Sequence, residues 1–205
     1  MTEVGMRPGQ PRMVLASASP RRAELLRQVG VTFRVAPMAI DESPRRGEAP
    51  DAYVRRMALE KAQAGWQATS GPPPVLGADT AVVLDGHIFG KPRDREDGVA
   101  MLAGLSGRRH RVYSAVALVA GSRAQVALSC SEVTLRRISV AEREAYWATG
   151  EPCDKAGGYA IQGLGAMFVA RLQGSYSGVM GLPLYETTRL LREFGMDCLL
   201  ARDGG

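Results

Sequence analysis

The feature that most constrains the fold is the apolar segment Val75–Leu84, which a single carboxylate interrupts. Gly71-Pro72-Pro73-Pro74 precedes it, and Asp85-Gly86, a hairpin-turn signal, follows it. An apolar run between such breakers predicts a strand buried in a sheet. A lone carboxylate in such a strand costs several kcal/mol unless it is paired, protonated or bound to metal. Asp79 is therefore the strongest functional candidate, and an Asp that hydrogen-bonds a neighbouring loop is the weaker alternative.

A second strand is predicted near the start of the sequence, over the apolar residues Met13–Ala16. Ser19-Pro20 then offers an N-cap oxygen and a proline suited to the first helical position, so a helix should begin there. Arg21 and Arg22 place two cations in the first turn, where the helix dipole is already positive. Free backbone N–H groups beside two guanidinium groups make a phosphate site. Two solvated arginines are an equally good interpretation of this segment alone.

Two lysines and a loop acid complete the candidates that the pattern itself indicates. Helical spacing from Pro50 to about Ala68 places Lys61 within an apolar stripe, where it either snorkels to solvent or meets an anion at the edge of a cleft. Lys91, between a glycine and a proline, would be held on a loop near the mouth of the sheet, although a solvated lysine fits equally well. Glu42 lies in an acidic pair after Met38–Ile40 and could ligate a hard cation, but such loop acids are usually just solvated.

The remaining pattern predicts the fold class. Two long β-prone runs, Arg111–Ala120 and Ala124–Arg137, are separated by Gly121-Ser122, which favours a hairpin. Strands that alternate with helices, together with this hairpin, indicate an α/β fold with a mixed sheet. We expect a loose tail over residues 1–12, a single domain over 13–197 and a C-terminal tail over 198–205. Within the domain, we expect a loop over Gly174–Gly178.

Composition limits the classes of function. The chain has 205 residues, a net charge of +5 and an isoelectric point of about 9.4, which suit one domain with an anionic partner. Aromatic residues are 6% of the chain, which gives little sign of a base-stacking surface. The three cysteines are widely spaced, so we expect buried, unpaired thiols in a reducing compartment. No segment reads as a signal peptide or a membrane span, and we expect a cytoplasmic protein without membrane partners.

The candidate residues together predict chemistry on a phosphate. The sequence has neither a G-x-x-x-x-G-K-[ST] loop nor a G-x-G-x-x-G turn that opens a helix. Of the two histidines, His110 lies among three arginines and reads as a surface residue. What remains is a buried carboxylate, two lysines, two arginines and a loop acid pair. This set suits metal-assisted attack of water on a phosphate, with the cations holding a polyphosphate.

Several short motifs resemble those of the Maf family of nucleoside triphosphate pyrophosphatases, from Leu15 to about Phe194. Each motif is weak alone, but their order and spacing together are specific. The matching segments are Ala16-Ser17-Ala18-Ser19-Pro20-Arg21-Arg22, Glu60-Lys61-Ala62, Gly77-Ala78-Asp79-Thr80, Gly90-Lys91-Pro92, Asp154-Lys155-Ala156-Gly157-Gly158-Tyr159, Ile161-Gln162-Gly163 and Gly181-Leu182-Pro183-Leu184.

The resemblance implies a mixed, strongly twisted sheet flanked by helices, with a cleft between two lobes. It implies hydrolysis of a nucleoside triphosphate to the monophosphate and pyrophosphate with Mg²⁺ or Mn²⁺, and it suggests a homodimer. Carried over by position, Asp79 would accept a proton, and Glu42 with Asp79 would hold the metal. The phosphate pocket would consist of Ser17, Arg21, Arg22, Lys61 and Lys91.

Within the family, the resemblance points to the branch that acts on dTTP and UTP, or on related pyrimidine nucleotides. The residues that indicate this specificity are Arg22, Thr80 and Gln162. Ser114 departs slightly from the pattern, because a threonine is usual at its position.

Two other classes of function remain open at this point. The basic cluster Arg108–Arg111 could serve a nucleic-acid-binding regulator, although we expect no nucleic acid partner. A nucleotide sensor that takes part in septum formation, without significant hydrolysis, is the other alternative.

Overall fold

The computed structural model describes residues 11–69, 71 and 73–198. The expected tails over residues 1–12 and 198–205 lie almost wholly outside these described residues. One mixed sheet runs through the molecule in the order β2-β1-β3-β5-β6-β7, with β4 paired to β3. The strands are β1 (Met13–Leu15), β2 (Phe33–Val35), β3 (Val75–Leu84), β4 (His87–Phe89), β5 (Arg109–Ala120), β6 (Arg123–Leu135) and β7 (Val169–Gln173).

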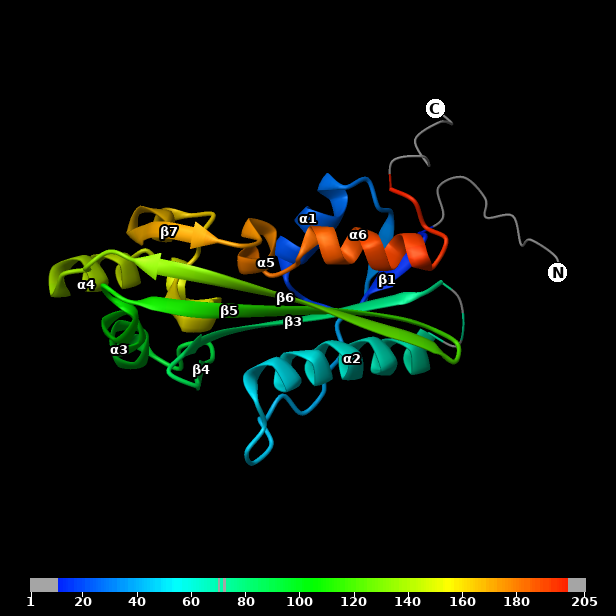
Figure 1. Ribbon diagram of the computed structural model, residues 1–205, viewed down its shortest axis with the longest axis horizontal. Helices are drawn as coiled ribbons and strands as arrows, with labels where there is room; N and C mark the ends of the chain where they lie inside the picture. The colour runs from blue at the N-terminus through cyan, green and yellow to red at the C-terminus, as the bar shows by residue number, and fades with distance from the viewer. Residues whose placement is uncertain (1–10, 70, 72, 199–205) are drawn as a thin grey trace.

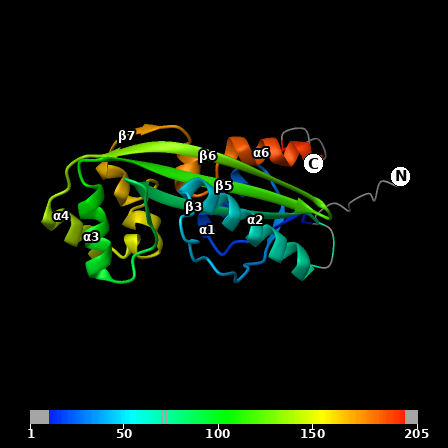
Figure 2. The same cartoon turned by 60° about the horizontal axis from the view of Figure 1, so that its bottom comes forward.

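The helices cover this sheet on both faces (Figures 1 and 2). They are α1 (Pro20–Gln28), α2 (Pro50–Thr69), α3 (Arg95–Leu105), α4 (Val140–Ala148), α5 (Tyr176–Met180) and α6 (Leu184–Glu193). Three short 3-10 helices lie between α4 and β7, namely η1 (Glu151–Asp154), η2 (Ala156–Gly158) and η3 (Leu164–Phe168). The predicted α/β fold with a mixed sheet is confirmed.

The strand β3 is the centre of the sheet, as its apolar pattern predicts. On one edge it pairs antiparallel with β5 from Val75 to Val83. On the other edge it pairs with two different strands, first parallel with β1 at Val75 and Leu76, then antiparallel with β4 from Val82 to Leu84. Among the described strands, none pairs with this edge over residues 77–81. The sheet therefore has an opening at its centre, and Asp79 lies beside it.

The opening separates two lobes that share β3, β5 and β6. In the first lobe, α1 and α6 pack on one face of the sheet around Leu26, Leu76 and Leu191, while α2 covers the opposite face (Figure 1). In the second lobe, α3, α4 and η3 surround a separate core that includes Leu102 and Phe168. The predicted two-lobed arrangement is thus built from separate apolar clusters along one continuous sheet.

A glycine allows α2 to approach β3 closely enough to bring its side chains to the opening. A Cβ atom at Gly77 would lie 2.2 Å from the carbonyl oxygen of Ala58 and 2.6 Å from the backbone nitrogen of Ala62. Backbone atoms cannot yield as a flexible side chain can, so only glycine fits here. This contact places Lys61, the residue before Ala62 in α2, against the centre of β3.

The structure also corrects several expectations. The segment expected to be a loop over Gly174–Gly178 contains the start of α5, whose N-cap Ser175 accepts a hydrogen bond from the backbone N–H of Gly178. Cys130 and Cys153 are exposed and Cys198 is half-buried, so the expectation of buried thiols was wrong. These residues carry too little sequence pattern to reveal their exposure.

Candidate active site

A cavity of about 460 Å³ occupies the space between the two lobes, at the opening beside β3. Residues from both lobes line it, which makes it the cleft between two lobes that the family resemblance implies. Every candidate residue from the sequence lines this one cleft: Ser17, Arg21, Arg22, Glu42, Lys61, Asp79, Thr80, Lys91 and Gln162.

The centre of the cleft holds a buried lysine between two carboxylates. Nζ of Lys61 lies 2.8 Å from Oδ1 of Asp79 and 2.8 Å from Oε1 of Glu42. Lys61 and Asp79 are each 7% exposed, whereas the Glu42 side chain is largely open to solvent. Lys61 therefore does not snorkel, and the cost of burying its charge is offset by the paired carboxylates. An ammonium group has three donors, so one remains for a ligand.

The surroundings shift the pKa values of Asp79 and Glu42 in opposite directions. Burial raises the pKa of Asp79 above its ordinary value of 3.8, and the charges of Lys61 and Arg22 act against this rise. For Glu42, burial acts in the same upward direction, but the hydrogen bond and charge of Lys61 outweigh it and the pKa is lowered. Of the two carboxylates, Asp79 is therefore the stronger base and the better proton acceptor.

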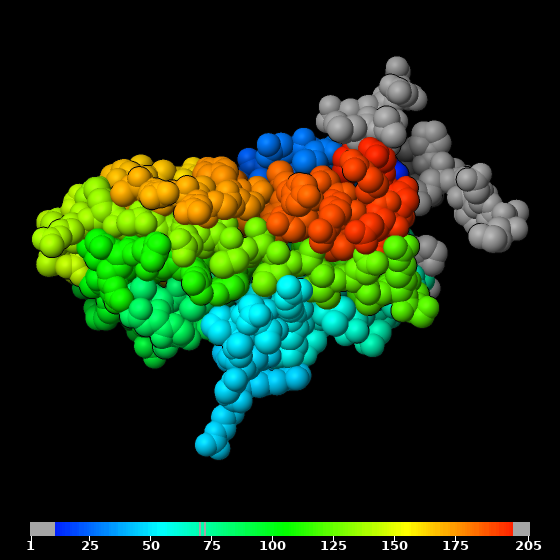
Figure 3. Space-filling view, viewed as in Figure 1, coloured from blue at the N-terminus to red at the C-terminus, as the bar shows by residue number. Residues whose placement is uncertain are grey.

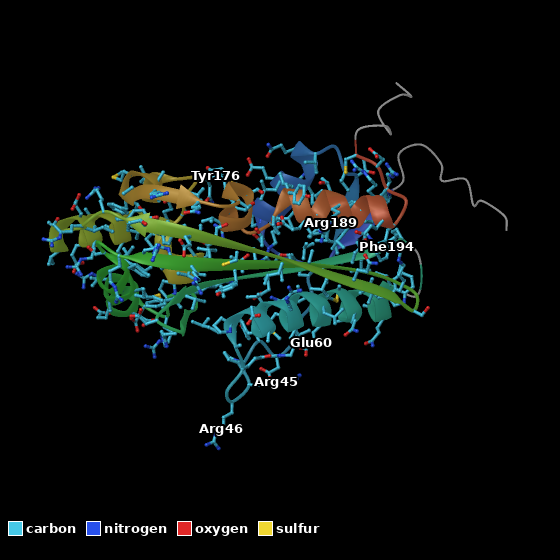
Figure 4. All side chains as sticks on the ribbon, in the orientation of Figure 1. Arg45, Arg46, Glu60, Tyr176, Arg189 and Phe194 are labelled. Carbon is cyan, nitrogen blue, oxygen red and sulfur yellow. The ribbon has the colours of Figure 1, made fainter. Side chains whose placement is uncertain are left out.

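The loop that carries Glu42 is fastened to α2. The hydroxyl of Tyr53 donates to the backbone carbonyl of Glu42 at 2.9 Å, and Arg56 donates to the carbonyl of Ser43 at 3.1 Å. Arg56 also binds both carboxylate oxygens of Glu48 at 2.6 Å. The tip of this loop projects from the body of the molecule, with Arg46 pointing away from it (Figures 3 and 4). The anchored part of the loop keeps Glu42 over the cleft.

The two arginines of α1 face the cleft and contact residues far along the chain. Nε of Arg22 donates to the carbonyl oxygen of Gly181 at 2.8 Å, and Nη1 donates to Oγ of Ser17 at 3.1 Å. Arg21 reaches toward Asp154 in the second lobe, with 3.7 Å between the charged groups. Burial lowers the pKa of Arg22, and the charge of Asp79 opposes this effect. The first turn of α1 therefore presents positive charge to the cleft.

The predicted side-chain N-cap of α1 is wrong in its detail. Ser19 occupies the N-cap position, but its side chain makes no capping hydrogen bond. Instead, the backbone N–H of Ser19 donates to Oγ of Ser17 at 3.2 Å. The first turn also carries no acidic residue. Its backbone N–H groups thus keep their capacity to bind an anion.

Thr80 lies on the opposite face of β3 from Asp79, because side chains alternate along a strand. Its hydroxyl contacts Oγ of Ser114 at 3.0 Å and lies 3.4 Å from the carbonyl oxygen of Gly181. Oγ of Ser114 in turn donates to the carbonyl oxygen of Gly178 at 2.6 Å. We call this the neutral face because the hydrogen-bond partners of Thr80 are uncharged, whereas Asp79 on the charged face meets the ammonium of Lys61. Arg22 donates to the same carbonyl oxygen of Gly181.

The second lobe contributes the segment that carries Gln162. Both carboxylate oxygens of Glu151 support it, because Oε2 accepts from the backbone N–H of Leu164 at 2.9 Å and Oε1 accepts from that of Gly165 at 2.9 Å. The hydroxyl of Tyr146 donates to Glu151 at 2.6 Å and accepts from the backbone N–H of Ala160 at 3.0 Å. The segment around Gln162 is therefore held by side chains behind it.

The loop with Lys91 is joined to the same lobe. The carbonyl oxygen of Gly90 accepts a hydrogen bond from the backbone N–H of Gly157 at 3.0 Å. Lys155, which also lines the cleft, forms an ion pair with Asp154. Lys91 and Lys155 therefore face the arginines of α1 from the other side of the cleft.

Sequence reasoning missed several residues at or behind the cleft. Tyr53 lines the cleft, and burial with the charges of Asp79 and Glu42 raises its pKa to about 12. His110 was expected at the surface, but it is 2% exposed and contacts the hydroxyl of Tyr159 at 2.8 Å. Burial lowers the pKa of His110 to about 4, so the ring is neutral at pH 7. Alternation along β5 could have shown that His110 points inward between two exposed arginines.

The acidic residues fit a divalent cation that a substrate also coordinates. Among the described residues there is no group of three or more His, Cys, Asp or Glu side chains that could hold a metal alone. Glu42 and Asp79 nevertheless converge on one point, since both contact the same nitrogen of Lys61. Mg²⁺ is commonly bound through one or two carboxylates together with substrate phosphates. Because the ammonium of Lys61 already occupies this point, a metal would be held by the carboxylate oxygens that do not contact Lys61, together with the substrate.

The fold and the cleft define an α/β protein with a cationic site that contains one buried carboxylate. The chain belongs to the Maf family, since the family model described as Maf-like protein matches residues 12–194. In the described part of the chain, no helix combines the length and apolarity needed to cross a membrane.

Curated relatives match along nearly their whole length. The dTTP/UTP pyrophosphatase of Alkalilimnicola ehrlichii is 54% identical over 193 residues, which are 92% of this chain and 95% of the relative. The dTTP/UTP pyrophosphatase of Methylococcus capsulatus is 55% identical over 185 residues, covering 90% and 92%. A solved nucleoside-triphosphatase / dITP/XTP pyrophosphatase from Mycobacterium abscessus is 18% identical, with a TM-score of 0.46 over 89% of this chain and 93% of that one.

Proposed function

We propose that this protein is a nucleoside triphosphate pyrophosphatase that hydrolyses dTTP and UTP to the monophosphate and pyrophosphate. The observation that carries the proposal is the buried Asp79 at the floor of a cleft whose walls carry Arg21, Arg22, Lys61 and Lys91. Relatives that are 54% and 55% identical carry the name dTTP/UTP pyrophosphatase, which supports the substrate assignment.

The reaction assigns a separate task to each part of the cleft. Arg21, Arg22 and Lys91 bind the anionic triphosphate, together with Ser17 at the start of α1. Water attacks the α-phosphorus while its proton passes to a carboxylate oxygen of Asp79, and the bond to the β-phosphate oxygen breaks to release pyrophosphate. The raised pKa of Asp79 suits this role, because a more basic carboxylate accepts the proton more readily.

Lys61 would stabilise the charge that develops during the attack. Two of its donors already point at Asp79 and Glu42, which fixes the ammonium group beside the proton acceptor. Its third donor can bind a phosphate oxygen. A preorganised cation in a site with little water is more effective than one that must reorient during the reaction.

We propose Glu42 and Asp79 as the residues that hold Mg²⁺ or Mn²⁺. When bound, the metal supplies positive charge that neutralises the phosphate oxygens and orients the substrate.

Thr80, Gln162 and Arg22 are proposed to select the nucleotide, since all three line the cleft. Residues 13–197 form the proposed catalytic domain, and the family match over 12–194 agrees with this extent. Because nucleoside triphosphates are cytoplasmic metabolites, we place the activity in the cytoplasm. On the family resemblance, we also propose a homodimer.

A nucleotide panel tests the proposal. Purified protein is incubated with dTTP, UTP, CTP, dATP and dGTP, with Mg²⁺ or Mn²⁺, and pyrophosphate release is measured. We expect turnover of dTTP and UTP well above that of the others, and none after chelation of the metal. Tight nucleotide binding without turnover would instead indicate a sensor. Salt-dependent DNA binding without turnover would indicate a nucleic-acid-binding regulator.

The structure gives the nucleic-acid alternative little support. Arg108 pairs with Asp85 at 2.6 Å, while Arg109 and Arg111 lie 3.4 and 3.8 Å from Glu132. The basic cluster is therefore partly neutralised by its own neighbours.

A further inference from the structure

The hydroxyl groups of Thr80 and Ser114 form a short chain behind the neutral face of β3. Ser114 is 1% exposed and faces Thr80 from the neighbouring strand β5, where the two residues are directly paired. Thr80 lines the cleft and Ser114 does not. The chain of hydroxyl groups thus runs from the cleft into the interior.

The proton of Ser114 is already committed within the protein. Its Oγ lies 2.6 Å from the carbonyl oxygen of Gly178, a distance typical of a good O–H···O hydrogen bond. A carbonyl oxygen carries no proton, so Ser114 must be the donor. A serine hydroxyl has one proton and two acceptor positions. Ser114 therefore has only acceptor capacity left for its other neighbour.

That neighbour is Thr80, and its proton is fixed by the same reasoning. Oγ1 of Thr80 lies 3.0 Å from Oγ of Ser114, and a hydrogen bond at this distance needs one proton. Because Ser114 has none to give, Thr80 is the donor. Its other partner within the protein, the carbonyl oxygen of Gly181 at 3.4 Å, can likewise only accept. With either partner, the proton of Thr80 is engaged by a protein acceptor and is not available to a ligand.

We infer that Ser114 is a positioning residue that makes Thr80 an obligate hydrogen-bond acceptor toward the substrate. A phosphate oxygen is also an acceptor and gains nothing from such a group. Thr80 therefore meets the nucleoside part of the substrate, at a group that donates an N–H or O–H. This inference rests on the proposed function, and it adds a chemical requirement for the bound nucleotide.

Two groups of dTTP can meet this requirement. Thymine and uracil carry an N3–H donor in the ring, where cytosine has an acceptor. The sugar carries a 3′-hydroxyl, which also donates. Both groups are single uncharged hydrogen-bond donors. Nucleotides that lack one of the two donors show which of them meets Thr80.

Binding of non-hydrolysable nucleotides to the whole protein tests the inference by calorimetry. The probes are α,β-methylene-dTTP, its N3-methyl derivative and its 3′-deoxy derivative. Loss of one hydrogen bond should weaken binding of one derivative roughly three- to tenfold. Weaker binding of the N3-methyl probe alone assigns the donor to the base, and weaker binding of the 3′-deoxy probe alone assigns it to the sugar. Equal binding of all three probes would overturn the inference.

Variants separate a hydrogen bond from a steric effect. In Thr80→Val, which keeps the shape but removes the acceptor, the parent probe and the sensitive derivative should bind equally. A loss that persists in Thr80→Val would contradict the assignment. Ser114→Ala removes the nearer acceptor for the proton of Thr80 and leaves only the more distant carbonyl oxygen of Gly181, so it should reduce the difference between the probes. Ser114→Thr keeps a hydroxyl and should preserve the difference. Equal behaviour of Ser114→Ala and Ser114→Thr would overturn the role of Ser114.

The readouts keep this inference separate from the proposed function. Binding is measured with probes that cannot be hydrolysed, and turnover of dTTP is measured independently. Absence of dTTP turnover would count against the proposed function alone. Absence of any difference between the three probes, with dTTP turned over, would count against the role of Thr80 and Ser114 alone.

Discussion

The two faces of β3 at the centre of the sheet differ sharply in chemistry. On the face toward α2, Asp79 meets the ammonium of Lys61, and Glu42 meets the same group from a loop. On the face toward α5, Thr80 meets the hydroxyl of Ser114 and the carbonyl oxygen of Gly181, and Ser114 in turn meets the carbonyl oxygen of Gly178. Adjacent residues of one strand thus have charged and uncharged hydrogen-bond partners. The difference suggests that one face performs the reaction and the other recognises the nucleoside.

The largest effect should follow from a change on the charged face. Asp79→Asn keeps the shape of the side chain but is a far poorer proton acceptor, so we expect kcat to fall at least about 100-fold. The same substitution removes one of the two carboxylates that offset the buried charge of Lys61. The variant should therefore be less stable than the parent at pH 7, as measured by thermal unfolding.

Asp85→Asn makes the same chemical change outside the cleft and serves as the control. Asp85 lies in the turn after β3 with a φ of 51°, a conformation that asparagine tolerates. Its turnover should stay within about twofold of the parent, as expected of a surface substitution. Full turnover by Asp79→Asn would refute the division between the two faces.

A packing change on the charged face should come next. Gly77→Ala places a methyl group 2.2 Å from the carbonyl oxygen of Ala58, so α2 must move away from β3. We expect a loss of about 1–3 kcal/mol in the free energy of unfolding, with lower turnover because Lys61 moves with the helix. Chemical denaturation and steady-state assays measure the two effects.

Gly104→Ala is the matched control for Gly77→Ala. Its added Cβ would meet only the ring of Phe89, at 3.8 Å, and alanine favours a helix interior over glycine. The free energy of unfolding should stay equal or rise. Similar losses in the two variants would show that close packing of α2 has no special importance.

The charged face should also set the pH dependence of turnover. Since turnover requires ionised Asp79, kcat/KM should fall as the pH decreases through the raised pKa of Asp79. Lys61 lowers this pKa, so Lys61→Gln should shift the acid limb of the profile to higher pH. Glu42 raises it, so Glu42→Gln should shift the limb to lower pH. Shifts in the same direction would contradict the proposed electrostatics.

The smallest effect should come from Glu151, which lies behind the segment that carries Gln162. Glu151→Gln weakens the support of the segment that carries Gln162, because an amide offers only one acceptor oxygen to the donors that Glu151 binds. We expect the ratio of kcat/KM for dTTP over dCTP to fall about threefold, with a smaller change in kcat for dTTP.

Glu144→Gln is its control, since among the described residues Glu144 forms its ion pair with Arg95, in a partly exposed position outside the cleft. Its dTTP to dCTP ratio should match that of the parent. A loss of turnover without a loss of selectivity in Glu151→Gln would place Glu151 with the charged face.

The charged face was predictable from sequence because its features are local. Asp79 stands out as a carboxylate in an apolar strand, and the helical register puts Lys61 among apolar residues. Arg22 stands out as a cation at the positive end of a helix. Each of these is unfavourable by itself, and the structure brings all three into one cleft.

The neutral face was less predictable because its features arise from distant segments. Ser114 contacts Gly178, and Thr80 contacts Gly181, across long separations in sequence. A hydroxyl in a strand costs little and gives no local signal. The same reason explains why Glu151 was not identified, since its partners lie in a segment without regular periodicity. Only the fold shows which carbonyl and amide groups these side chains reach.

The opening in the sheet has a consequence for self-association. An unpaired strand edge ordinarily offers its N–H and C=O groups to strands of other molecules, and that favours aggregation. Here the unpaired stretch of β3 lies between β1 and β4, which are paired to the same edge on either side of it. Another strand would have to displace one of them to dock. The unpaired stretch thus lines the cleft through Asp79 and Thr80, while its position protects it from intermolecular β-pairing.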